Sequence, residues 1–474
     1  MSSWILQGLA ALWPEVCLSL GALLVVLIGV FSRRPWKVVA ASAGVIVATA
    51  VALWMSRATP DGAYFSRLIV LDQTSEVFRW IALGVVALVG LMAAGSIEVD
   101  ASWTGEYFGL VLLVGVGLML MAEANHLLMA YLAIELVSLS SYLLVAFLRD
   151  ARSSEAALKY LLFGALSSGI MLFGLSLLYG LTGVWTFPQI RQAILSTGPL
   201  IGAPVAVASV LILAGLAFKI SIVPFHLWTP DVYEGAPIPV TAMLSVGPKA
   251  AGLALLFRIG YALGPVWAVL EPAFFVFTMI TMTLGNVAGL VQTNIKRLLA
   301  YSTIGQVGYL LIGFSVNTPM GWSAMLVYLA AYLIMNLGAF ACVVAVARDA
   351  QSESLEAFRG LAKRSPLLAA CLAVFLLSLA GLPPFVGFMG KFLLFGSAIE
   401  SHQATLAFVG ILNSAIALYY YVNIIRLMYL LPPERPAALQ PAWSLRLATV
   451  VCGAATVALG VFPGLLLAWL GIKA

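Results

Sequence analysis

Four lysines and one glutamate stand where a long apolar helix leaves little room for charge. Glu135 lies about ten residues into an apolar run, and Lys219, Lys249 and Lys391 lie inside three others. Burying a lysine at the centre of a membrane helix costs about 2.5–3.5 kcal/mol. A buried glutamate must find a cation or take up a proton, and a desolvated lysine releases its proton more easily. This pattern predicts a set of proton-exchanging groups.

Other interpretations fit some of these residues. Lys159 lies only a few residues into its run, so its ammonium could reach the headgroups or form a structural pair. Glu135 could be a neutral, hydrogen-bonded carboxyl. His226 titrates near neutrality and could relay protons, although a histidine that caps backbone carbonyls is nearly as common. For Asp231 and Glu234, which follow in the same loop, a solvated or capping role is the default.

Composition decides what kind of element carries these groups. Of the 474 residues, 63% are hydrophobic and 9% charged, whereas soluble domains have about 25% charged residues. Runs of 20 apolar residues match the thickness of a bilayer, and they lack the alternation of a membrane barrel. The sequence therefore predicts an all-α polytopic membrane protein with about 14 transmembrane helices. The expected spans are 14–31, 38–56, 77–95, 106–122, 126–148, 155–181, 202–223, 238–261, 265–291, 298–316, 321–347, 366–397, 402–429 and 443–468.

The charges between the spans predict an orientation. Fourteen lysines and arginines fall on the side reached after the first span, against six on the other, and the four remaining cations are the lysines inside spans. By the positive-inside rule the first side is cytoplasmic. Both termini are then expected on the non-cytoplasmic side of a bacterial inner membrane.

Two spans carry helix breakers beside a lysine. Leu213-Ala-Gly-Leu precedes Lys219 and Pro224, and Leu379-Ala-Gly-Leu precedes Pro383, Pro384 and Lys391. Proline removes a backbone donor and interrupts a helix. Interrupted spans at corresponding places point to a transporter's ion path.

The similarity extends backwards along the chain and predicts a repeat. Ser141-Tyr-Leu-Leu resembles Gly308-Tyr-Leu-Leu, each two spans before its broken helix. Units of five spans lie in opposite senses, so spans 4–8 and 9–13 would be two inverted five-helix repeats; chance similarity between leucine-rich helices is the rival explanation. We expect a single membrane domain, 1–474, with three N-terminal helices (1–100), repeats at 101–262 and 263–430, and a C-terminal helix (431–474).

No cofactor motif is evident. Cys17, Cys342, Cys371 and Cys452 lack the paired spacing of zinc, haem or iron–sulfur ligands, and the three histidines are scattered. A glycine-rich nucleotide loop is also missing. We expect no cofactor or metal in this chain, and no nucleic-acid partner.

Several runs resemble one family closely. The helix of Glu135, the segment Arg152-Ser-Ser-Glu-Ala-Ala-Leu-Lys-Tyr, and above all Pro224-Phe-His-Leu-Trp-Thr-Pro-Asp-Val-Tyr-Glu-Gly-Ala-Pro resemble the antiporter-like subunits of the proton-pumping NADH–quinone oxidoreductase, respiratory complex I. The N (ND2) type fits best, because the M type carries a glutamate at the position of Lys391 and the L type adds a lateral helix. The resemblance covers essentially the whole chain.

This resemblance implies roles for these residues, and it implies which cofactors and subunits would be found in the same complex. Glu135 corresponds to the glutamate that pairs with the lysine of the seventh helix, here Lys219. Lys249, Lys391 and Lys159 correspond to the lysines of the eighth, twelfth and sixth helices. Flavin, iron–sulfur clusters and quinone would belong to partner subunits, and neighbours would include an M-type subunit, small subunits such as K and J, and lipids. Two alternatives are a subunit of a Mrp-type cation/proton antiporter and a passive scaffold, and the buried lysines argue against the scaffold.

Overall fold

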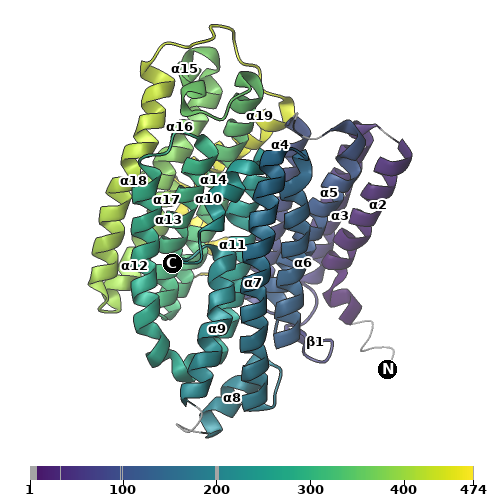
Figure 1. Ribbon diagram of the computed structural model, residues 1–474, viewed down its shortest axis with the longest axis vertical. Helices are drawn as coiled ribbons and strands as arrows, with labels where there is room; N and C mark the ends of the chain where they lie inside the picture. Colours follow the sequence, from purple (N-terminus) through teal and green to yellow (C-terminus); the bar gives the residue numbers. More distant parts are fainter. Residues whose placement is uncertain (1–7, 33, 97, 99, 198–201, 473–474) are drawn as a thin grey trace. The chain divides into compact units, whose positions relative to one another are not determined.

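The apolar runs form helices because a helix satisfies its own backbone hydrogen bonds, which lipid cannot do. The computed structural model describes residues 8–32, 34–96, 98, 100–197 and 202–472, and these are nearly all helical (Figure 1). Within them, 13 helices are long and apolar enough to cross a membrane. They are α2 (Trp13–Ser32), α3 (Pro35–Ser56), α4 (Gln73–Gly95), α5 (Thr104–Glu123), α6 (Leu127–Val145, continued by η2, Ala146–Leu148), α7 (Ala151–Thr182), α9 (Gly202–Ile220), α11 (Ile238–Ala262), α12 (Trp267–Gly289, preceded by η4, Gly264–Val266), α13 (Ile295–Ser315), α14 (Pro319–Ala350), α18 (Ala404–Leu430) and α19 (Trp443–Val461).

The span predicted at 366–397 is a broken helix, as expected. It consists of α16 (Pro366–Ala380) and α17 (Val386–Glu400). Gly381 ends α16 with φ +91°, and its N–H donates to the carbonyls of Leu377 and Ser378 at 3.1 and 3.0 Å. A φ in this range favours glycine. The Pro383–Pro384 peptide bond that follows is cis.

The other predicted break lies after α9. Ser221 has φ +67°, the Val223–Pro224 bond is cis, and the chain continues into α10 (Trp228–Gly235). Pro224 and Pro384 each stand three residues after the positive-φ residue that follows the helix. The repeated Leu-Ala-Gly-Leu motif does not mark equivalent positions in the two breaks. Its first copy lies inside α9, whereas its second copy spans the end of α16.

The remaining elements are short and connect the long helices. They include a small antiparallel hairpin, β1 (Gly62–Tyr64) and β2 (Ile69–Leu71), in which Gly62 pairs with Leu71 and Tyr64 with Ile69. The all-α prediction missed it, because a hairpin of two three-residue strands gives almost no periodic signal. The others are η1 (Ala101–Trp103), α8 (Phe187–Thr197), η5 (Leu355–Phe358), α15 (Leu361–Arg364) and α20 (Pro463–Trp469).

The chain divides into two compact units, described separately. Unit 1 comprises Met1–Gly90, Val99–Ile220 and Gly247–Pro272, and unit 2 comprises Leu91–Glu98, Ser221–Val246 and Ala273–Ala474. In unit 1, α2 packs on α3 and α5, α5 on α6, and α7 on α9. Gly29 and Gly105 let α2 and α5 touch backbone to backbone, since a Cβ on Gly29 would lie 2.6 Å from Gly105 Cα. In unit 2, the deeply buried α14 packs against α13, α16, α17 and α19.

Candidate functional site

Three of the predicted site residues come together in unit 1, on α6, α9 and α11. Lys219 and Lys249 are 1% and 0% exposed. Lys219 Nζ donates a hydrogen bond of 2.9 Å to Ser138 Oγ, one turn along α6 from Glu135. Glu135 is close enough for its charge to act on Lys219. Its Oε1 is buried and has no hydrogen-bond partner among the described residues, so the 2.9 Å hydrogen bond of Lys219 is with a serine one turn from the carboxyl and not with the carboxyl itself.

The end of α9 explains why an ammonium is tolerated there. Lys219 lies in the last turn, one residue before α9 ends at Ile220. The carbonyls of a last helical turn carry partial negative charge, which favours a cation. The early end of the helix, which the sequence predicts from Pro224, therefore positions both the lysine and the charge that stabilises it.

Lys249 approaches Lys219 because α9 and α11 are in close contact. Gly252, one turn beyond Lys249, faces α9, and a Cβ there would lie 2.3 Å from Ile220 Cγ2 and 4.0 Å from Lys219 Cγ. The charges of Lys219 and Lys249 act on each other. Pro248, inside α11, cannot donate a backbone hydrogen bond, so the carbonyl four residues earlier is free of that partner.

Lys391 occupies a different environment, within unit 2. It is 2% exposed on α17. Its Nζ donates to the Ala380 carbonyl at 3.2 Å and to Ser414 Oγ at 3.1 Å, and lies 4.0 Å from the centre of the Tyr309 ring. Ala380 is the last residue of α16, so the helix break supplies a carbonyl for the ammonium. No carboxylate among the described residues pairs with it, and the aromatic face contributes a cation–π interaction.

The two other predicted site residues lie elsewhere. Lys159 forms an i,i+4 ion pair of 2.8 Å with Glu155 on α7, and its side chain is 40% exposed. His226, in unit 2, is 6% exposed in the segment between α9 and α10, and its Nδ1 is buried with no hydrogen-bond partner in the described part of the chain. Asp231 and Glu234 both accept from Arg297 Nη1 at 2.8 Å.

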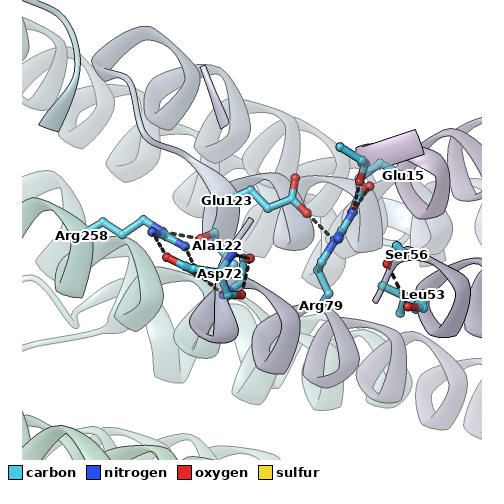
Figure 2. A network of polar contacts seen from close by, with 10 residues as sticks. Glu15, Leu53, Ser56, Asp72, Arg79, Ala122, Glu123 and Arg258 are labelled. Atoms are coloured by element: carbon cyan, nitrogen blue, oxygen red, sulfur yellow. Dashed lines mark hydrogen bonds and ion pairs between the residues drawn. The ribbon is translucent and has the colours of Figure 1, made fainter. Parts of the chain in front are cut away.

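Sequence reasoning assigned twenty cations to loops and span edges, and the structure buries four of them. Arg79, Arg258, Lys296 and Arg364 are 2–8% exposed. Arg79 and Arg258 take part in the polar contacts of Figure 2. Lys296 donates to the Ala236 carbonyl at 2.8 Å and pairs with Glu353 at 2.5 Å. The positions of Arg79 and Arg258 inside the predicted spans 77–95 and 238–261 were the available signal.

Potential cofactor ligands are also dispersed. The described residues contain no group of three or more His, Cys, Asp or Glu side chains that could hold a metal ion. The four cysteines are free thiols. The chemistry that this arrangement offers is proton exchange between buried amines and carboxyls.

Sequence comparisons identify relatives along most of the chain. Residues 124–417 match the family model described as NADH:quinone oxidoreductase/Mrp antiporter, TM. NADH-quinone oxidoreductase subunit N of Anaeromyxobacter sp. (strain Fw109-5) is 42% identical over 96% of this chain and 94% of that protein. NAD(P)H-quinone oxidoreductase subunit 2 of Microcystis aeruginosa is 42% identical over 89% of this chain and 83% of that protein.

Solved structures give the same fold. A chain of respiratory complex I from Thermus thermophilus superposes with a TM-score of 0.83 at 32% identity, over 96% of this chain and 98% of the other. A chain of the Mrp complex from Dietzia sp. DQ12-45-1b superposes with a TM-score of 0.87 at 24% identity, over 98% and 96%. At that lower identity the likeness concerns the fold alone.

Proposed function

The chain belongs to the NADH:quinone oxidoreductase/Mrp antiporter family of membrane subunits, and we propose that its buried glutamate and lysines carry the protons it translocates. It functions as a proton-translocating, non-redox membrane-arm subunit of a respiratory NADH–quinone oxidoreductase, beside other antiporter-like subunits. The single observation that carries the proposal for the residues is the burial of Lys219, Lys249 and the Glu135 Oε1 atom in one unit, with a direct contact between Lys219 and Ser138.

Charge balance suggests how the group in unit 1 works. Glu135, Lys219 and Lys249 together would carry one excess positive charge if all were ionised. An uncompensated charge is costly in a buried site, so the group is most stable with one lysine neutral. Which of Lys219 and Lys249 is the neutral one changes when Glu135 moves toward or away from Lys219. A proton is thereby accepted at one lysine and released from the other.

In this proposal Lys391 carries the proton after Lys219 and Lys249. Its ammonium is held by a carbonyl, a hydroxyl and an aromatic face, none of which takes its proton. Release therefore depends on a change around Lys391, such as arrival of a second positive charge. Lys159 and His226 have secondary roles. Lys159 forms an exposed ion pair with Glu155 and so changes the charge carried by α7. His226 exchanges protons through its unpartnered Nδ1.

The arrangement in the membrane follows from the same proposal. The protein is a multi-pass membrane protein. We place both termini on the non-cytoplasmic side of a bacterial inner membrane, on the basis of the fourteen-to-six distribution of cations. The two breaks, each with a proline three residues after a positive-φ residue, support inverted repeats in spans 4–8 and 9–13.

An M-type subunit and small subunits such as K and J are the proposed neighbours, and flavin, iron–sulfur clusters and quinone would be held by partners.

The Mrp-type antiporter remains the weaker alternative, because that likeness extends only to the fold. The test is proton pumping per NADH oxidised by the assembled complex in membrane vesicles. Glu135→Gln, Lys219→Ala and Lys249→Ala should each lower it, whereas Lys363→Ala, at an exposed lysine of α15, should not. Undiminished pumping by the three variants would refute the assignment. Sodium-dependent proton flux without NADH oxidation would favour the antiporter.

A further inference from the structure

A second buried charged cluster lies in unit 1, on helices that the proposed lysine group does not use. Arg79 of α4 lies between Glu15 of α2 and Glu123 of α5 (Figure 2). Arg79 donates to both carboxylate oxygens of Glu15, from Nε at 2.9 Å and from Nη2 at 2.7 Å, and also to the Ala11 carbonyl at 2.7 Å. The side chains of Arg79, Glu15 and Glu123 are 3%, 4% and 0% exposed.

Glu123 has the fewest hydrogen-bond partners of the three. One of its oxygens contacts Arg79 Nε. That nitrogen carries a single hydrogen, however, and the hydrogen is directed at Glu15. Both Glu123 oxygens are buried with no hydrogen-bond partner in the described part of the chain. An ionised carboxylate in this position would lack the hydrogen bonds that a buried charge needs.

The neighbouring charges do not correct this imbalance, because they cancel in pairs. Arg258 of α11 binds Asp72 through two hydrogen bonds of 3.0 and 2.9 Å and donates to the Ala122 carbonyl (Figure 2). Glu76 of α4 pairs with Arg57, which follows α3. The cluster of Glu15, Arg79 and Glu123 therefore keeps one excess negative charge when both carboxyls are ionised.

We propose that Glu15, Arg79 and Glu123 form a buried proton-binding site, in which one proton is held on Glu123 and shared with Glu15. Oε1 of each carboxyl contacts the same nitrogen, Arg79 Nε, which brings the two carboxyls together. A protonated Glu123 donates to Glu15, which gives one of its two unpartnered oxygens a hydrogen bond and brings the net charge of the cluster to zero. A metal cation would meet the guanidinium already lying between the carboxyls, so a proton is the better ligand. This inference does not rest on proton translocation by the lysines.

The test is infrared spectroscopy of the assembled complex at pH 7, comparing wild type with Glu123→Gln. An ordinary exposed glutamate is ionised at that pH. We expect the wild type to show the carbonyl stretch of one protonated carboxyl, shifted in D₂O, which Glu123→Gln removes. Glu15→Gln should abolish the same band, because one carboxyl then faces one guanidinium and ionises. Either variant suffices if the other fails to assemble.

The matched control is Glu356→Gln, at an exposed glutamate paired with Arg359. It should remove only the absorption of an ionised carboxylate. The proposal is overturned if Glu123→Gln or Glu15→Gln likewise removes only an ionised carboxylate band at pH 7. A protonated band that appears only when sodium is withdrawn would also overturn it, in favour of a bound cation. Proton pumping is measured separately, so loss of pumping in Lys249→Ala leaves this result untouched.

Discussion

Gly252 sets the distance between α9 and α11, and therefore between Lys219 and Lys249. In Gly252→Ala the new methyl carbon would lie 2.3 Å from Ile220 Cγ2, whereas carbon atoms pack at about 3.5–4.0 Å. The helices must separate by more than about 1 Å. Overpacking of this kind costs about 1–3 kcal/mol, against about 1 kcal/mol gained by replacing a helical glycine with alanine. The net effect is a destabilisation of about 0–2 kcal/mol.

The effect on function should be larger. A displacement of about 1 Å can slow a positioned reaction about 100-fold, so we expect proton transfer through this subunit to slow about tenfold or more and proton pumping per NADH to fall. The assay is dye-detected acidification of vesicles, with NADH oxidation as the control for assembly. Gly169→Ala, in α7, is the matched control because nothing lies within 4 Å of the added methyl.

A compensating substitution makes the reasoning refutable. Leucine has no Cγ2, so Ile220→Leu removes the atom that the new methyl meets. The double variant Gly252→Ala, Ile220→Leu should recover most of the pumping. Wild-type pumping by Gly252→Ala alone, or a double variant no better than the single one, would show that this contact does not position the lysines.

Two further predictions concern the turns that hold functional groups. Gly381→Ala forces alanine to φ +91° and places its Cβ 2.8 Å from Lys391 Cδ; we expect about 1–2 kcal/mol of strain and lower pumping, and normal pumping would show that Lys391 does not need its present position. His126 Nδ1 accepts the Leu128 N–H at the start of α6, and partial burial lowers the pKa of this histidine. Because the folded-state pKa is lowered, the stabilisation by this cap is fully present above the unfolded-state pKa of about 6.5 and is lost as the pH falls below it and through the lower folded-state pKa. His126→Asn, which keeps an N-cap acceptor, should make the thermal midpoint of the purified complex less dependent on pH between 7 and 5, and an unchanged dependence would contradict this role.

The broken helices and the buried lysines could be predicted from the sequence because their causes are local. An apolar run becomes a helix because lipid offers its backbone no other partner. Pro224, Pro383 and Pro384 end or interrupt helices wherever the chain carries them. A lysine in such a run is conspicuous by its cost alone, which is why Lys219, Lys249 and Lys391 stood out.

Which side chains meet could not be predicted in the same way. Arg79 and Glu15 are 64 residues apart, and Arg79 was assigned to a span edge because an arginine near a helix end usually reaches water. Lys159 lies in a helix as apolar as the others, yet the face of α7 that carries it is exposed. Ser138 gave no signal as the partner of Lys219, since serine is common in membrane helices.

The sequence by itself determined the placement of the long helices, the two breaks and the burial of Lys219, Lys249 and Lys391, though not that of Lys296, because each follows from the free energy of a segment in lipid. Only the tertiary structure decided the partners of those charges: Ser138 for Lys219, the Ala380 carbonyl and Tyr309 ring for Lys391, and two carboxyls for Arg79. A segment's apolar length fixes that it crosses the membrane. Its rotation and its neighbours depend on packing between residues far apart in the chain, which hydropathy along the sequence does not encode.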